Sequence, residues 1–200
     1  MGVNVVAFQD ASGNLGMTGS ELGGVGQPMW PGTSPSLCQF GSDANQLALA
    51  FQLKDGNLFV LATDGTATGE AALGMKEDTS PSLCALGWGW GVAFQDNNGF
   101  LYLNGNLNWG EKNTNTDPEM SMLAARTSPC ISKLAGGYVV ALQRADGNVL
   151  LYGDLKYDEH WARGTGHQPK HHLVRWGLRG RIRNSPGQQQ HHRSIGAWEL

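Results

Sequence analysis

A hexapeptide recurs three times in this chain, and the repeat constrains the fold more than any other feature. TSPSLC at residues 33–38 returns 46 residues later at residues 79–84. A looser copy, TSPCIS at residues 127–132, follows after a further 48 residues. A fixed period of this length indicates one supersecondary unit repeated along the chain.

A second block, ending in glutamine, follows each hexapeptide. It reads AFQ or ALQ, at residues 7–9, 50–52, 93–95 and 141–143. A glycine turn comes after every block, at Gly13, Gly56, Gly99 and Gly147. The first block has no Thr-Ser-Pro before it, so we expect the chain to open part-way through a unit.

The pattern of one unit predicts a small antiparallel sheet. Ser-Pro begins a strand where proline costs no ladder hydrogen bond. A second strand, such as 138–143, is rich in valine and aromatic residues, and the Asp-Gly or Asn-Gly that follows favours a tight hairpin. We expect a third strand at 57–62 or 100–103 and a short fourth one at 72–75.

Four strands in about 40–50 residues is the size of one β-propeller blade. We therefore expect an all-β fold, a partial β-propeller of four-stranded antiparallel blades, with another all-β repeat such as a solenoid as the alternative. The expected units are a partial blade at 1–32, blades at 33–78, 79–126 and 127–166, and an irregular tail at 167–200. Propellers need about 4–8 blades. We therefore expect either self-association that completes one or a truncated remnant of a longer gene, and we favour the remnant.

The tail differs chemically from the repeats. Residues 1–160 carry a charge of −9 and residues 161–200 carry +6, and five of the six histidines lie in this last segment. A fourth Thr-Ser-Pro is due near 173–175. Reading the codons shifted by one base permits Gly-Thr-Ser-Pro and a Val-Ala-Phe strand in the right order. We interpret residues from about 167 as a frameshifted, disordered translation.

This interpretation removes the obvious tail motifs from consideration. His171-His172 and His191-His192 resemble metal ligands, but adjacent histidines rarely share one site, and we expect no metal and no cofactor. Arg175, Arg179, Arg181 and Arg183 could contact phosphates, yet no aromatic platform or helical period accompanies them, so we expect no nucleic-acid partner.

The rest of the chain argues against an enzyme, a disulfide framework and a membrane protein. No histidine precedes residue 160, so a histidine-based triad cannot form there. Cys38, Cys84 and Cys130 recur at small-residue positions of one strand face, which favours buried thiols. We see no run of 18 apolar residues and no signal peptide, and expect no membrane association.

The unit TSPSL, VAFQ, DGNL resembles a tandem repeat of secreted bacterial proteins, often actinobacterial and often beside hydrolase domains. Its layout is also similar to the blades of propeller lectins such as the Photorhabdus lectins and tachylectin-2. The resemblance covers about residues 3–166. It implies a non-catalytic, extracellular, lectin-like protein that binds glycans or polysaccharide, with a structural or protein-interaction module of a larger secreted protein as the alternative.

A saccharide site needs an aromatic face and polar groups for the hydroxyls. The candidate sugar contacts are Trp30, Trp88, Trp90, Asn108, Trp109 and Trp161. Packing between blades is the alternative for each tryptophan. Gln9, Gln52, Gln95 and Gln143 recur at one position, where we expect them to satisfy neighbouring backbone groups. Asp55 and Asp146 are expected to form turns.

Overall fold

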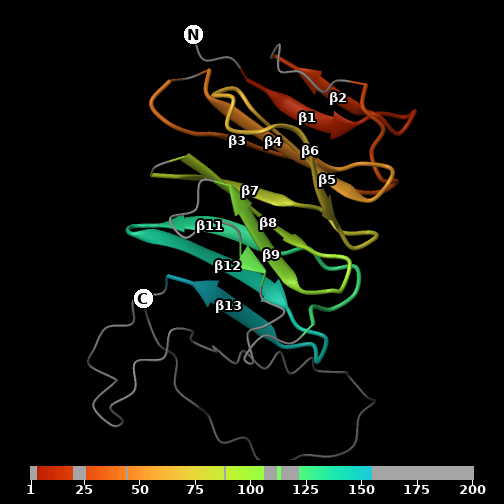
Figure 1. The fold of residues 1–200 in the computed structure, drawn as a ribbon, viewed down its shortest axis with the longest axis vertical. Coiled ribbons are helices and arrows are strands. Elements are labelled where there is room, and N and C mark those ends of the chain that lie inside the picture. The colour runs from red at the N-terminus through yellow and green to blue at the C-terminus, as the bar shows by residue number, and fades with distance from the viewer. Residues whose placement is uncertain are drawn as a thin grey trace, which may run out of the picture.

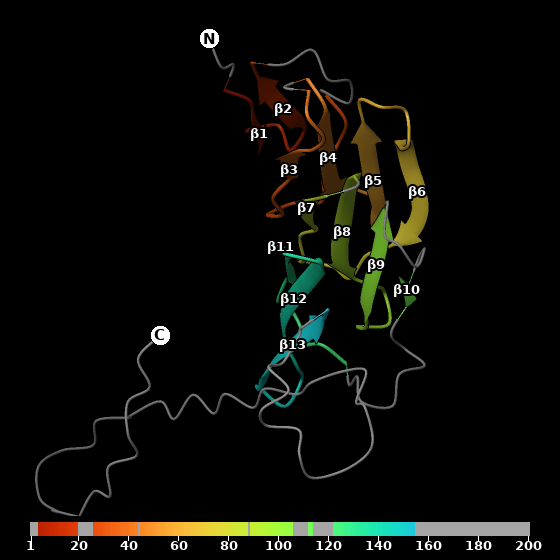
Figure 2. The ribbon, with the colours of Figure 1, turned by 90° about the vertical axis from the view of Figure 1, so that its left-hand side faces the viewer.

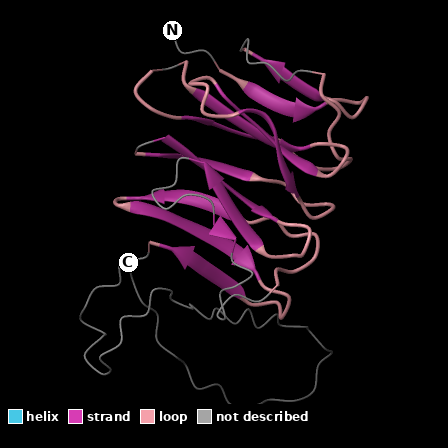
Figure 3. Cartoon of the chain, in the orientation of Figure 1, coloured by secondary structure: helices cyan, strands magenta, loops and turns pink. Residues whose placement is uncertain are grey.

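The computed structural model of this chain describes residues 4–19, 26–43, 45–87, 89–105, 112–113 and 122–154. These residues form strands and turns and include no helix, so the fold is all-β, as the repeat predicts (Figure 3). Within them, the strands make antiparallel sheets of two, four, four and three strands.

The sheets follow one another along the sequence. The first pairs β1 (Val6–Gln9) with β2 (Leu15–Thr18). The second consists of β3 (Ser36–Gln39), β4 (Leu47–Gln52), β5 (Asn57–Ala62) and β6 (Thr68–Gly74). The third consists of β7 (Ser82–Leu86), β8 (Gly89–Gln95), β9 (Leu101–Gly105) and β10 (Lys112–Asn113). The fourth consists of β11 (Cys130–Leu134), β12 (Gly137–Gln143) and β13 (Val149–Gly153).

Most strands lie where the sequence predicts them. Strands β3, β7 and β11 each begin directly after the proline of a Thr-Ser-Pro. Strand β5 matches the expected 57–62, whereas β6 begins at Thr68, earlier than the expected 72–75. The expected blade spans 33–78 and 79–126 each contain one four-stranded sheet. The predicted tail at 167–200 lies outside the described residues.

The sheets stack in sequence order along the long axis of the molecule (Figure 1). Strand β7 contacts both β3 and β11. Figure 2 shows these three first strands at one side of the stack, with β6 and β10 at the other. Each sheet therefore repeats the orientation of its predecessor, and the same strand positions meet at every junction.

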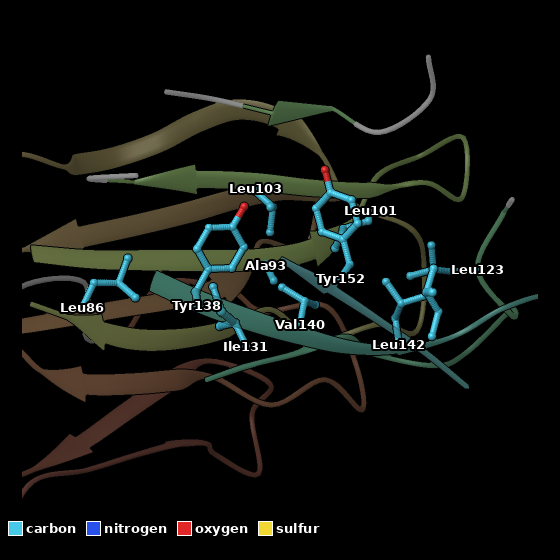
Figure 4. Close-up of a cluster of buried hydrophobic side chains, with 11 residues drawn as sticks. Leu86, Ala93, Leu101, Leu103, Leu123, Ile131, Tyr138, Val140, Leu142 and Tyr152 are labelled. Atoms are coloured by element: carbon cyan, nitrogen blue, oxygen red, sulfur yellow. The ribbon is translucent and has the colours of Figure 1, made fainter. Parts of the chain in front are cut away.

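Apolar side chains fill the space between consecutive sheets. One cluster, around Phe51, joins the first two sheets, and a second, around Phe94, joins the next two. The third lies between the last two sheets and is shown in Figure 4, where Tyr138 and Val140 face Ala93 and Leu103. Because no sheet has a closed core of its own, folding depends on stacking.

The segments between sheets join their neighbours through backbone pairing. Met29 bridges Leu53. The Met29 amide donates to the carbonyl of Gly13 at 2.9 Å, and Gly13 lies in the hairpin turn of the preceding sheet. Equivalent bridges join Met75 to Asp96 and Leu123 to Arg144. Each connection thus holds the hairpin of one sheet against the next sheet.

Candidate functional site

The Thr-Ser-Pro turns share one local geometry. The threonine hydroxyl donates to the carbonyl three residues earlier: Thr33 to Trp30 at 2.8 Å, Thr79 to Lys76 at 2.7 Å and Thr127 to Ala124 at 2.7 Å. The residue before each threonine has positive φ, with Gly32 at 76°, Asp78 at 59° and Arg126 at 61°. The repeated threonine therefore fixes a turn that puts its preceding residue in the left-handed region.

A left-handed conformation is easy for glycine and costly for other residues. Gly32 shows that this turn accepts glycine, yet Asp78 and Arg126 stand at the same position in the next two units. Strained non-glycine residues concentrate at functional sites. Asp78 and Arg126 are therefore marked by their backbone as candidate functional residues.

The three turns bring Trp30, Asp78 and Arg126 together as one set of side chains, which we call the turn row. The Trp30 indole Nε1 donates to Asp78 Oδ1 at 3.4 Å, and Arg126 Nε lies 3.3 Å from Asp78 Oδ2. The Asp78 and Arg126 side chains remain 48% and 81% exposed. The row thus presents an aromatic ring, a carboxylate and a guanidinium on the surface.

Serines lock the turns of neighbouring sheets together in reciprocal pairs. The Ser34 amide donates to Ser80 Oγ at 2.9 Å, and the Leu83 amide donates to Ser36 Oγ at 2.9 Å. The next pair of sheets repeats this: the Ser80 amide donates to Ser128 Oγ at 2.8 Å, and the Ile131 amide donates to Ser82 Oγ at 3.2 Å. The Ser36 and Ser82 hydroxyls thus satisfy outward amides of the edge strands β7 and β11, and the other two hydroxyls satisfy amides of the Thr-Ser-Pro turns.

The recurring glutamines satisfy backbone groups, as expected. The Gln9 amide donates to the Trp30 carbonyl at 3.0 Å, and Gln52 donates to the Met75 carbonyl at 3.2 Å. Gln9 Oε1 also accepts the Gly32 amide at 3.1 Å. The Gln9 side chain therefore holds the turn that carries Trp30 in place, which is a structural role.

The cysteines are free thiols. Cys130 is exposed, whereas Cys38 and Cys84 are partly buried. The expectation of buried thiols therefore holds only in part, and it is wrong for Cys130, which lies on the edge strand β11. Burial, and then the neighbouring Cys84, raises the pKa of Cys38 to about 12. Burial also raises the pKa of Cys84. These two thiols are protonated near neutral pH.

The six predicted sugar contacts have different placements. Trp30 belongs to the turn row and is half-buried. Trp90 is 3% exposed between the second and third sheets, and its indole Nε1 donates to Thr66 Oγ1 at 3.0 Å. Its ring has no free face for a sugar, so packing is its role in this structure. The other four candidates, Trp88, Asn108, Trp109 and Trp161, lie outside the described residues.

Asp55 and Asp146, in the hairpin turns, use their carboxylates to accept hydrogen bonds from nearby backbone amides. Asp55 Oδ1 accepts the Asn57 amide at 3.0 Å, and Asp146 Oδ1 accepts the Asn148 amide at 3.0 Å. Both aspartates thus form turns, as the sequence predicts.

Among the described residues, no group of three or more His, Cys, Asp or Glu side chains is placed to hold a metal ion. That part of the chain also has no helix long and apolar enough to cross a membrane.

Sequence reasoning missed Asp78 and Arg126. The available signal was the residue before each Thr-Ser-Pro, which changes from Gly32 to Asp78 to Arg126, as do the two residues before it, while the Thr-Ser-Pro itself repeats. Variable residues next to a constant Thr-Ser-Pro mark where a repeat array varies its surface. The pairing with Trp30 could not be read in advance, because it depends on how the sheets stack.

A scan against protein-family models found no match for this chain, and a search of curated proteins found none either.

Proposed function

We propose that this chain is a non-catalytic, lectin-like repeat protein that binds carbohydrate at the turn row. The observation that carries the proposal is the contact of Trp30 with Asp78, which Arg126 extends. An indole ring stacks on the apolar face of a sugar, while a carboxylate and a guanidinium bind its hydroxyls. The strained Asp78 backbone supports the same assignment.

We also propose that the stacked sheets are blades of a β-propeller. The support is the side-by-side arrangement of the first strands β3, β7 and β11, together with the antiparallel order within each sheet. In a propeller, the innermost strands of neighbouring blades approach one another around a central axis. The turn row would then lie at one end of the inner strands, where the polypeptide enters each blade.

Binding to a glycan array and to immobilised polysaccharides tests the carbohydrate proposal. Trp30→Ala is expected to weaken binding of the best ligand by about tenfold or more, which corresponds to about 1.4 kcal/mol of lost binding energy. Trp30→Phe should retain part of the affinity, because it keeps a ring while losing the indole N–H donor.

Asp78→Gly separates binding from folding. The substitution removes the carboxylate and relieves the positive φ of 59°, so we expect stability to be unchanged or slightly higher and sugar binding to be weaker. Unchanged sugar binding in both Trp30→Ala and Asp78→Gly would contradict the turn-row site. Absence of binding to any glycan would contradict the lectin-like function itself.

A structural or protein-interaction module is the second candidate. The observation that favours it is the exposure of Val6 and Phe8 on β1, at 53% and 41%. Apolar side chains grouped at the end of a stack mark a contact surface. A protein partner captured without any sugar binding would favour this function.

A further inference from the structure

The face of each sheet that looks toward its predecessor carries two apolar positions on the second strand. These positions are buried in the three later sheets: Leu49 and Phe51 are 0% exposed, Val92 and Phe94 are 0% exposed, and Val140 and Leu142 are 0% and 3% exposed. In the first sheet the same positions are Val6 and Phe8, at 53% and 41%. We call Val6 and Phe8 the leading face.

The leading face has the same cross-strand arrangement as the equivalent buried faces of the later sheets. Phe51 stacks on Phe59, with ring centroids 4.8 Å apart, and Phe94 stacks on Tyr102 at 5.1 Å. Phe8 pairs across the strands with Gly16 in the same register, and its ring lies where a Cβ on Gly16 would be. The Phe8 ring thus lies flat against its own sheet, as the rings of Phe51 and Phe94 do where a preceding sheet packs on them.

The last sheet has the complementary face. In the second sheet Ala50 and Val60 pair across β4 and β5, and both are covered by the third sheet, at 0% and 3% exposed. The equivalent pair in the last sheet is Ala141 and Leu151, and both are only partly buried. We call Ala141 and Leu151, with their neighbours Val139 and Val149, the trailing face.

We infer that a second copy of this chain docks head to tail, with the leading face of one copy on the trailing face of the other. Three junctions inside the chain already join this pair of faces, through the clusters around Phe51, Phe94 and Leu142. Residues of neither face carry a charge. A second copy therefore supplies a surface with the strand register and apolar character that the open face requires.

Head-to-tail contacts either close into a ring or extend into fibres. Each copy contributes four described sheets, so two copies contribute eight. A ring of eight sheets falls within the range of about 4–8 blades seen in propellers. We therefore infer a closed dimer with two equivalent interfaces. This inference concerns assembly and does not depend on sugar binding at the turn row.

Light scattering coupled to gel filtration tests the inference on the full chain. The wild-type chain is expected to be a dimer at micromolar concentration. Phe8→Asp, and separately Leu151→Asp, should each yield monomers, with the dissociation constant raised by about 100-fold or more, because a carboxylate would be buried without a partner. Met122→Asp is the matched control, since Met122 is 49% exposed and lies on neither face.

Mixing the two face variants distinguishes this geometry from a symmetric contact. The Phe8→Asp copy keeps its trailing face and the Leu151→Asp copy keeps its leading face, so an equimolar mixture should form a one-to-one dimer through one interface. If like faces met, one of the two variants would dimerise alone. Circular dichroism checks that each variant is folded, and Ala141→Glu replaces Leu151→Asp if that variant unfolds.

The inference would be overturned if the wild-type chain stayed monomeric at protein concentrations from 100-fold below to 100-fold above the micromolar range. So would dimers that persist in both single variants. A third result would also contradict docking of a second copy: the wild-type chain is monomeric and Leu151→Asp lowers its stability. Another part of the same chain would then cover the trailing face.

Discussion

Replacing Phe94 with alanine is expected to lower the free energy of unfolding by about 3–5 kcal/mol. Phe94 is 0% exposed, stacks on Tyr102 and belongs to the cluster that joins the second and third sheets. Its loss removes apolar contact from two sheets at once and leaves a cavity that the strands cannot close. Urea denaturation followed by circular dichroism measures the change.

Phe8→Ala is the control for this prediction, because Phe8 occupies the same position of the repeat with 41% of its surface exposed. Its loss should cost under about 1 kcal/mol. Both substitutions are best made in a Leu151→Asp background, where head-to-tail association contributes nothing. Equal losses for Phe8 and Phe94 would contradict the stacking of the third sheet on the second.

Replacing Gly105 with alanine is expected to destabilise the fold by about 2–4 kcal/mol. Gly105 has a φ of 114°. A Cβ there would lie 2.7 Å from the Trp90 carbonyl oxygen and 2.8 Å from atoms of the Trp90 ring. Both neighbours are fixed, since Trp90 is buried in the core. Thermal and urea unfolding of the variant measure the effect.

Gly147→Ala supplies the comparison, because Gly147 also has positive φ, at 83°, and a Cβ there would meet nothing within 4 Å. Only backbone strain opposes that change, so we expect a loss of about 1 kcal/mol. The difference between the two variants reports the steric contact with Trp90. Similar losses at both glycines would place the Trp90 ring elsewhere.

Local rules explain how much of the fold the sequence predicts. Pro35 and Pro81 mark the starts of strands because proline is tolerated at the first residue of a strand. The Asp-Gly turn after Gln52 defines the following strand, found at Asn57–Ala62 as expected. These features act within a few residues, so a single repeat carries them. The all-β fold follows from that local information.

Relations between sheets were harder to predict. The Ser36 and Ser82 hydroxyls bond to residues 47 and 49 positions later, and the strand alternation only indicates that a small residue is needed there. The Gly-Trp-Gly-Trp pattern is as compatible with an exposed Trp90 as with a buried one. Its burial follows from the register of β8, which pairs Trp90 with Ala85 and puts it on the same face as Val92 and Phe94. Trp30 and Asp78 meet for the same non-local reason.

Amide hydrogen exchange measured by NMR in the wild-type chain and in Ser82→Ala tests the stacking of the repeats most directly. The Ile131 amide points away from its own sheet and donates to Ser82 Oγ at 3.2 Å. We predict that this amide is protected in the wild-type chain and exchanges about tenfold faster or more in Ser82→Ala. Ser132→Ala, at an exposed serine of the same strand, should leave it unchanged. Equal exchange of the Ile131 amide in the wild-type chain and Ser82→Ala would contradict the stacked arrangement.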